Sequence, residues 1–332
     1  MNEIQQLLLS DMPLWISPGG YIQLMISAFP VMRSVGLPMR NVADDDVTLA
    51  GLQSALLPDA KTYQERTHSH LESISNLMKQ EDSTKQVTLT DDFDSEELPE
   101  GSIAYHRIFG LITAGSRWYF SSKQLEKDLQ EAEGNPSITA HLMHVNSPGG
   151  EAWYLDRLAE TLQNCRKPIL AIYENCTSAA YHIACHAQRI YANTKFDFVG
   201  CIGTMTSFYD FEEYYKQLGI KKVEAKATQS DLKNKMFDDL CDGKPKQYIE
   251  RVLNPLNDNF IATVKSQRKQ LAQLGNDTPV LRGETYYTED AIQIGLCDGQ
   301  RTLIEAIAEC AAMGKKYYDT FQKKNSLYNA IL

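Results

Sequence analysis

An alternation of short apolar runs with helix-like segments between residues 103 and 193 constrains the fold of this 332-residue chain most strongly. The runs predict strands at Ile103–Phe109, Ile138–Val145, Pro168–Tyr173 and Arg189–Asn193, and the segments between them predict helices at Lys123–Ala132, Glu151–Leu162 and Ser178–Ala187. Strands joined by helices of this length pair in parallel. The sequence therefore predicts an α/β protein.

The remaining segments extend this prediction in both directions. Apolar periodicity predicts a mostly helical region over residues 1–80, in particular at Ile4–Leu9, Tyr21–Met32 and Leu71–Met78. Past Gly203 we expect strands at Thr204–Phe208 and Ile220–Ala225, helices at Phe211–Leu218, Thr288–Ile294 and Leu303–Ala312, and a helical stretch Lys246–Leu274 that Pro255 kinks or divides.

Residues 81–100 are polar and acidic around a single Phe93. Charge repulsion and scarce apolar residues favour a linker, and the alternative is an exposed acidic loop within one domain. We therefore expect a helical region over 1–80, a linker over 81–100, a main domain over 101–312 and a C-terminal tail over 313–332.

Composition and charge narrow the class of protein. Apolar residues make up 43% and charged residues 23% of the chain, which is typical of a soluble globular protein. The formal net charge is −10 and no block of Lys and Arg stands out, so we expect no nucleic-acid partner. The N-terminus lacks a basic patch followed by an apolar core, and we expect no signal peptide or membrane anchor.

The seven cysteines are scattered and never form a Cys-x-x-Cys pair. This pattern favours free thiols in a reducing compartment, and hence a cytoplasmic protein without a disulfide framework or zinc site. His182 and His186 have helical metal-ligand spacing, but no carboxylate motif accompanies them and a packing role is favoured. We expect no metal and no cofactor.

Two turns carry the candidate chemistry. In Asn146–Gly150, the backbone N–H groups of Gly149 and Gly150 would lie between a strand and a helix start, where they can hold an oxyanion. In Asn175–Tyr181, Ser178 would begin a helix as an exposed nucleophile, with the N–H of Ala179 as a further oxyanion donor. The alternatives are a helix N-cap for Ser178 and tight turns for the glycines.

A serine hydroxyl needs a base. No histidine lies beyond residue 186, and both His182 and His186 would point along the nucleophile's own helix rather than across the cleft. Lysine is the remaining candidate base, and a lysine amine must be desolvated to be neutral near pH 7 to 8.

Four segments in order resemble the signal peptide peptidase A family, which includes phage capsid assembly (prohead) proteases. They are Val145–Gly150, Thr177–Tyr181, Gly200–Met205, and Gly283–Tyr286 with Ala291–Asp298. The resemblance covers roughly residues 101–312 and implies a ClpP/crotonase-like fold of repeated strand-strand-helix units. It also implies a serine endopeptidase with a Ser/Lys dyad and a ring-like homo-oligomer.

Relatives place the lysine roughly fifty residues after the serine, which falls near Ser230 here. Lys233 is the first candidate, with Lys235 and Lys226 as alternative bases. The expected substrate is an extended polypeptide, either capsid scaffold protein or signal-peptide-like fragments. Ala179 and Ala180 stand where the family usually has glycines, which keeps open a catalytically inactive scaffolding protein. An acyl-CoA-handling crotonase relative, which has no need for Ser178, is a further alternative.

Overall fold

The computed structural model describes residues 14–16, 62–208, 210 and 212–329. The strands are β1 Leu14–Ile16, β2 Leu89–Thr90, β3 Ser102–Phe109, β4 Ile112–Thr113, β5 Phe120–Ser121, β6 Ile138–Ser147, β7 Gly149–Glu151, β8 Ile169–Thr177, β9 Arg189–Ala192, β10 Phe198–Gly200, β11 Thr285–Tyr286 and β12 Gly299–Gln300. The helices are α4 Tyr63–Met78, α5 Ser122–Gly134, α6 Leu155–Asn164, α7 Ala179–Ala184, α8 Glu212–Gln217, α9 Lys235–Cys241, α10 Lys246–Tyr248, α11 Asn254–Gln267, α12 Lys269–Ala272, α13 Thr288–Ile294 and α14 Leu303–Asn329, with short 3₁₀ or π turns at Thr228–Ser230, Ile249–Leu253 and Pro279–Arg282.

The central sheet has the order β11-β10-β8-β6-β3-β2, and β9 and β12 extend it beside β8. Its pairs are parallel except β10 with β11. Because both faces are covered, β6 is buried along almost its whole length, including the two histidines His141 and His144. The predicted α/β class is confirmed.

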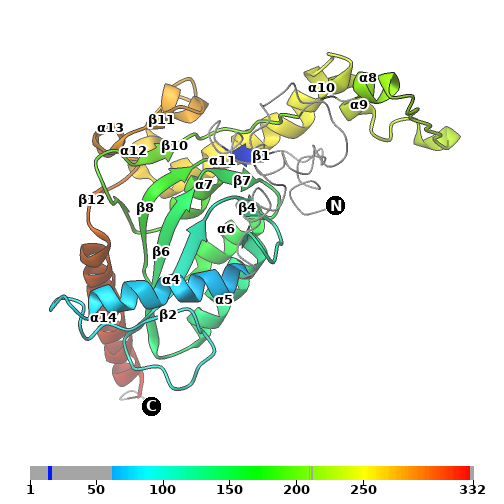
Figure 1. The fold of residues 1–332 in the computed structure, drawn as a ribbon. Coiled ribbons are helices and arrows are strands. Elements are labelled where there is room, and N and C mark those ends of the chain that lie inside the picture. Colours follow the sequence, from blue (N-terminus) through cyan, green and yellow to red (C-terminus); the bar gives the residue numbers. More distant parts are fainter. Residues whose placement is uncertain (1–13, 17–61, 209, 211, 330–332) are drawn as a thin grey trace, which may run out of the picture.

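Helices cover both faces of this sheet (Figure 1). On one face α4 and α14 pack against β3, β6 and β8 through an apolar cluster that includes Leu71, Leu142 and Ile307. On the other face α5, α6, α7 and α11 pack over a cluster that includes Leu129, Leu158 and Phe260. The turns that carry Gly149 and Ser178 follow β6 and β8 at the carboxyl end of this three-layer core.

A second, small sheet runs in the order β1-β7-β4-β5. The strand β7 pairs in parallel with β4 on one side and antiparallel with β1 on the other, with Ile16 opposite Gly149 and Leu14 opposite Glu151. A Cβ at Gly150 would collide with the carbonyl oxygen of Ile112, so only glycine allows β7 to approach β4 this closely.

Most predicted elements of the main domain are confirmed, and Thr288–Ile294 matches α13 at both ends, with Gly295 at a φ of +94° closing it. The helix predicted at Glu151–Leu162 begins instead at Leu155, because residues 149–151 are held as strand β7. The predicted helix Lys246–Leu274 is divided, with Pro255 in the first turn of α11 and a second break at Arg268.

The strands predicted at Thr204–Phe208 and Ile220–Ala225 are wrong. Residues 220–225 have no strand partner among the described residues and are exposed, with Val223 at 85% exposure. They belong to an arm, residues 212–245, that carries α8 and α9 away from the core (Figure 1).

The proposed segment boundaries at 81, 101 and 313 are not marked by breaks in the structure. Strand β2 joins the central sheet, Phe93 is buried, and α14 runs without interruption past residue 313. The helices expected at Ile4–Leu9 and Tyr21–Met32 lie outside the described residues, and Leu71–Met78 forms the second half of α4.

Candidate active site

Ser178 lies at the tight turn between β8 and α7. Its backbone has φ +58° and ψ −122°, a conformation that costs an L-residue about 1–3 kcal/mol. Its side chain is fully buried, and among the described residues the Ser178 hydroxyl has no nitrogen or oxygen partner and faces the Cys201 thiol. As an N-cap, Ser178 makes no side-chain bond to the helix, so the capping alternative does not explain it.

Hydrogen bonds between neighbouring motifs hold this turn in place. The Ser178 N–H donates to Gly200 O at 2.8 Å, and the Cys201 N–H donates to Glu284 O at 2.8 Å. Gly200 pairs with Thr177 on β8 and with Thr285 on β11. The segments that resemble one family in sequence therefore converge on Ser178 in space.

The glycine turn adjoins Ser178 through strand pairing and helix packing. Ser147 lies opposite Cys176, and α7 packs against β7. The Gly149 N–H donates to Ser147 Oγ at 3.1 Å, and that hydroxyl donates to Gly110 O at 2.6 Å. An oxyanion at Gly149 would have to share or replace this bond.

The helix dipole does not act on Gly149 and Gly150, contrary to the expectation from the sequence. Gly149 and Gly150 lie in an extended strand, four or more residues before α6 begins, so their N–H groups do not belong to a helix N-terminus. Ala179 is the first residue of α7, and the first N–H groups of a helix lack intrahelical acceptors. Ala179 therefore keeps the helix-terminal position expected of an oxyanion donor.

Cys201 is a neighbour of Ser178 that the sequence did not identify. It is a non-glycine residue at φ +52°, and its thiol faces the Ser178 hydroxyl. Burial raises the pKa of the Cys201 thiol to about 11, so it is neutral and cannot serve as the base.

The candidate lysines lie on the arm rather than beside Ser178. Lys226 Nζ is 3.0 Å from both Glu224 and Asp238, and these carboxylates raise the pKa of Lys226, opposite to what a general base needs. Lys235 Nζ is 2.6 Å from Asp239, and Lys233 follows the 3₁₀ turn on the exposed arm. None of the three contacts the Ser178 hydroxyl, which has no nitrogen or oxygen partner among the described residues.

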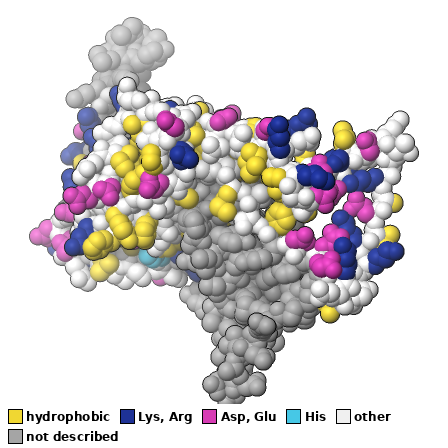
Figure 2. Space-filling view, turned by 90° about the horizontal axis from the view of Figure 1, so that it is seen from above, with side chains coloured by type: hydrophobic (Ala, Val, Ile, Leu, Met, Phe, Trp, Pro, Cys, Tyr) yellow, Lys and Arg dark blue, Asp and Glu magenta, His cyan; other side chains and the backbone are white. Residues whose placement is uncertain are grey.

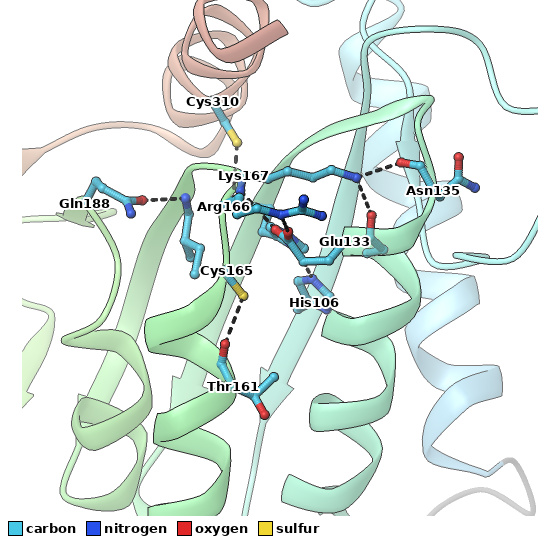
Figure 3. A network of polar contacts seen from close by, with 12 residues as sticks. His106, Glu133, Asn135, Thr161, Cys165, Arg166, Lys167, Gln188 and Cys310 are labelled. Carbon is cyan, nitrogen blue, oxygen red and sulfur yellow. Dashed lines mark hydrogen bonds and ion pairs between the residues drawn. The ribbon is translucent and has the colours of Figure 1, made fainter. Parts of the chain in front are cut away.

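Lys167 has the depressed pKa of a catalytic lysine but the wrong position. Burial lowers the pKa of Lys167 to about 8, and its ammonium donates to Ala132 O and Asn135 O at the end of α5 (Figure 3). Lys167 precedes β8 whereas Ser178 follows it, so the length of that strand, about 30 Å, separates them. Lys167 is therefore a structural cation.

The same network contains the one group of metal-ligand type among the described residues, formed by Glu133, His141 and Cys165. Its donor atoms are already engaged: Glu133 Oε1 is 3.2 Å from His141 Nε2 and 3.0 Å from the Lys167 N–H, and the Cys165 thiol donates to Thr161 O. The hydrogen bonds from His141 and the Lys167 N–H lower the pKa of Glu133 to about 2, despite its partial burial. The cluster is explained as an ion-pair network that joins α5 to β6 and β8 (Figure 3).

His182 packs within the core, with its ring centroid 5.2 Å from that of Phe260 and 5.9 Å from that of His186. Burial lowers the pKa of His182 well below its usual range. This packing agrees with the preference for a packing role over a metal site.

The sequence profile of peptidase family S49 matches residues 161–316. The chain is 28% identical over 182 residues to a putative protease of Methanocaldococcus jannaschii, which covers 54% of this chain and 57% of that protein. It is 27% identical to protease 4 of Haemophilus influenzae, covering 74% of this chain and 40% of that protein. It is also 22% identical to a putative signal peptide peptidase SppA of Enterococcus faecium, covering 74% and 71%. The chain thus spans about half the length of the first two relatives.

Among solved structures, the chain is similar to a variant of the 1510-N membrane-bound stomatin-specific protease, with a TM-score of 0.40, 15% identity, and coverage of 63% of this chain and 83% of that one. None of the helices in the described part of the chain combines the length and apolar character needed to cross a membrane. The profile match includes Ser178 and the segments Gly200–Met205 and Gly283–Tyr286. Residues 161–316 of this chain therefore match peptidase family S49, and the relatives named protease 4 and signal peptide peptidase SppA support the same family.

Proposed function

We propose that this protein is a serine endopeptidase in which the Ser178 hydroxyl attacks the peptide carbonyl of an extended polypeptide. The observation that carries the proposal is the conformation of Ser178: a strained backbone and a buried hydroxyl without a nitrogen or oxygen partner among the described residues, at the start of α7 and next to the glycine strand β7. Strain of this kind persists only where the surrounding structure enforces it, and it is concentrated at functional sites.

The oxyanion would be held by backbone N–H groups of β7 and α7. Gly149, Gly150 and Ala179 are the candidates, and the closeness of β7 to β4 keeps the glycine N–H groups rigidly placed. Donors that need no reorganisation contribute most to stabilising a developing negative charge.

The base would come from the arm of a second copy of the chain. The arm exposes a set of large apolar side chains, Leu218, Ile220, Val223 and Leu232, each at least 53% exposed. Figure 2 shows charged side chains of both signs gathered at the right-hand end, where the arm lies. Exposed apolar groups on a projecting segment favour an interface. A homo-oligomer in which the arm packs on a neighbour would desolvate a lysine there, with Lys233 as the first candidate and Lys235 and Lys226 as alternatives.

A catalytically inactive scaffolding protein is the second candidate. The observation that favours it is the separation of all three lysines from Ser178 within one copy, together with the carboxylate partners of Lys226 and Lys235. The peptidase and the scaffolding protein would have the same fold and the same oligomer, and only the peptidase would turn over a substrate.

The experiment is a time course with unfolded casein at pH 8, comparing wild type with Ser178→Ala by gel and intact mass. Wild type should degrade casein, and Ser178→Ala should lower turnover about 10³-fold or more. The variant should remain folded, because the buried hydroxyl that it removes has no nitrogen or oxygen partner among the described residues. Equal turnover by both proteins would exclude Ser178 as nucleophile, and absence of turnover in a folded, oligomeric wild type would favour the scaffolding protein.

The proposal extends to the substrate of the protein and to its location in the cell. The physiological substrate would be capsid scaffold protein or signal-peptide-like fragments, both of which present extended chains. The seven free cysteines favour a reducing compartment, and we propose a cytoplasmic location on that basis.

A further inference from the structure

The outer edge of β7 is occupied by a segment of the same chain. Strand β1 pairs antiparallel with β7 in the register Leu14 to Glu151, Trp15 to Gly150 and Ile16 to Gly149 (Figure 1). More than 130 residues of sequence separate the two strands, so this pairing is a long-range contact.

The edge that β1 occupies adjoins the candidate oxyanion donors. Without β1, one side of Gly149–Glu151 would be an unpaired edge, and such edges accept an extended peptide by strand addition. Gly149 and Gly150 have no side chains to select a sequence, so the edge recognises a polypeptide backbone. An extended substrate that reaches the oxyanion donors would lie along this same edge.

Contacts with the rest of the domain hold β7 in an extended conformation that a strand can pair with. Glu151 accepts the Ala114 N–H at 2.6 Å, and Gly149 is fixed by Ser147 Oγ at 3.1 Å. Since β7 is placed by the core of the domain, removing β1 would expose a preformed site.

The nucleophile is closed in this arrangement. The Ser178 side chain has no exposed surface, so a peptide carbonyl cannot reach its hydroxyl until a neighbouring group moves. In this structure, β1 occupies the edge of β7 while the Ser178 hydroxyl is inaccessible.

We propose that the N-terminal segment around Leu14–Ile16 is an intramolecular pseudosubstrate that holds the β7 edge and competes with polypeptide substrates. The proposal rests on the proposed peptidase function for its kinetic consequence, but not for the pairing itself. A tethered strand competes at a millimolar effective concentration, whereas a three-residue pairing contributes only a few backbone hydrogen bonds of about 1 kcal/mol each. The segment can therefore both occupy the edge and be displaced by a longer substrate strand.

The first test measures the pairing without using activity. In full-length Ser178→Ala protein, amide hydrogen exchange of residues 149–151 is compared with that in Ser178→Ala/Trp15→Pro, since proline removes the backbone donor at the centre of β1. The amides of β7 that face β1 should exchange at least about tenfold faster if β1 shields the edge most of the time, whereas the Gly149 amide, which donates to Ser147 Oγ, should change less. Ser178→Ala/Trp15→Ala is the matched control: it keeps the backbone donor and should retain protection. Equal exchange in the proline variant and its parent would overturn the proposal whether or not the protein is a peptidase.

The second test is kinetic and uses Ser178-containing protein with casein. If β1 occupies the edge about nine-tenths of the time, Trp15→Pro should lower KM about tenfold and leave kcat unchanged. A synthetic peptide of residues 10–20 should inhibit Trp15→Pro competitively. An active enzyme whose KM is unchanged in Trp15→Pro would overturn the pseudosubstrate role and leave the peptidase assignment standing. Inactivity of all Ser178-containing proteins would instead count against the proposed function, and the exchange experiment would still decide the occupancy of β7.

Discussion

The backbone N–H of Ser178 donates to the carbonyl oxygen of Gly200 at 2.8 Å, which joins the turn between β8 and α7 to the end of β10. Gly200 has a φ of +112°, and a Cβ at this position would lie 2.8 Å from the carbonyl oxygen of Glu284. The strained turn at Ser178 is therefore supported by a neighbour that only glycine can provide.

Gly200→Ala should destabilise the protein by about 1–3 kcal/mol, because it adds both backbone strain and a steric clash. Turnover should fall further than the loss of folded protein explains, since the strand that positions Ser178 is displaced. Thermal unfolding and casein turnover measure the two effects. Gly134→Ala is the matched control: its Cβ would meet nothing within 4 Å, and stability should change by less than about 0.5 kcal/mol. Equal effects at the two glycines would contradict the role assigned to Gly200.

An ion pair between the buried Arg268 and the partly exposed Asp298 anchors the motif Ala291–Asp298. Arg268 Nη2 lies 2.9 Å from Asp298 Oδ1, Arg268 also donates to Gly295 O, and Asp298 accepts the Ile190 N–H at 2.7 Å. Arg268→Ala should destabilise the protein by about 1–3 kcal/mol, because it removes a buried guanidinium together with its hydrogen bonds to Gly295 O and to the partly exposed Asp298 carboxylate. The exposed pair Lys244–Asp242 is the control, and Lys244→Ala should change stability by less than about 1 kcal/mol in urea unfolding. Similar losses at both sites would show that Arg268 is no more than a surface cation.

Sequence patterns predicted the core well and the site only in part. Buried parallel strands such as β8 begin with short apolar runs, so composition and length identified them. Strand β7 was missed because its length is three residues, two of them glycine, and it is set by the pairing of Gly150 with Ile112 rather than by local propensity. Val223 and its neighbours look like a strand in isolation, but a strand needs a partner, and the described chain supplies none there.

Cys201 and β1 could not have been identified from sequence for a related reason. The position of Cys201 beside Ser178 depends on a hydrogen bond to Glu284, more than 80 residues away in the chain. Residues 14–16 carry no pattern that distinguishes them, and their pairing with β7 depends on the exposed edge that the folded domain presents. Nothing in a local window encodes either contact.

Buried histidines should make the fold sensitive to acid. Burial lowers the pKa of His106 well below its usual range, and the neighbouring His141 lowers it further. Below pH 6.5 the unfolded chain binds a proton at His106 that the folded protein does not, so stability falls with pH by up to about 1.4 kcal/mol per unit for this group. His106→Phe should reduce the slope of unfolding free energy between pH 6.5 and 4.5.

The exposed His68 provides a control of opposite sign for that measurement. A hydrogen bond to Asp91 raises the pKa of His68, so its contribution is present at low pH and is lost as pH rises through the folded-state pKa. His68→Phe should therefore steepen the loss of stability on acidification only above about pH 6.5, where His68 titrates, and leave the slope between pH 6.5 and 4.5 nearly unchanged. An unchanged slope in His106→Phe would show that His106 is protonated in the folded protein.

The arm leads to a prediction about mixed oligomers. The proposed base of Ser178 is a lysine from another copy of the chain. Ser178→Ala should then lack turnover when assayed alone. So should one of the lysine variants, Lys233→Ala, Lys235→Ala or Lys226→Ala. Unfolding and refolding the two together would create sites that pair an intact serine with an intact lysine. Turnover on casein should return to about a quarter of the wild-type value at equal mixing, since random assortment leaves each site both intact groups at a frequency of one half times one half. Each variant refolded by itself is the control. A mixture as inactive as its components would show that both groups come from one copy, with the arm folding back on its own core.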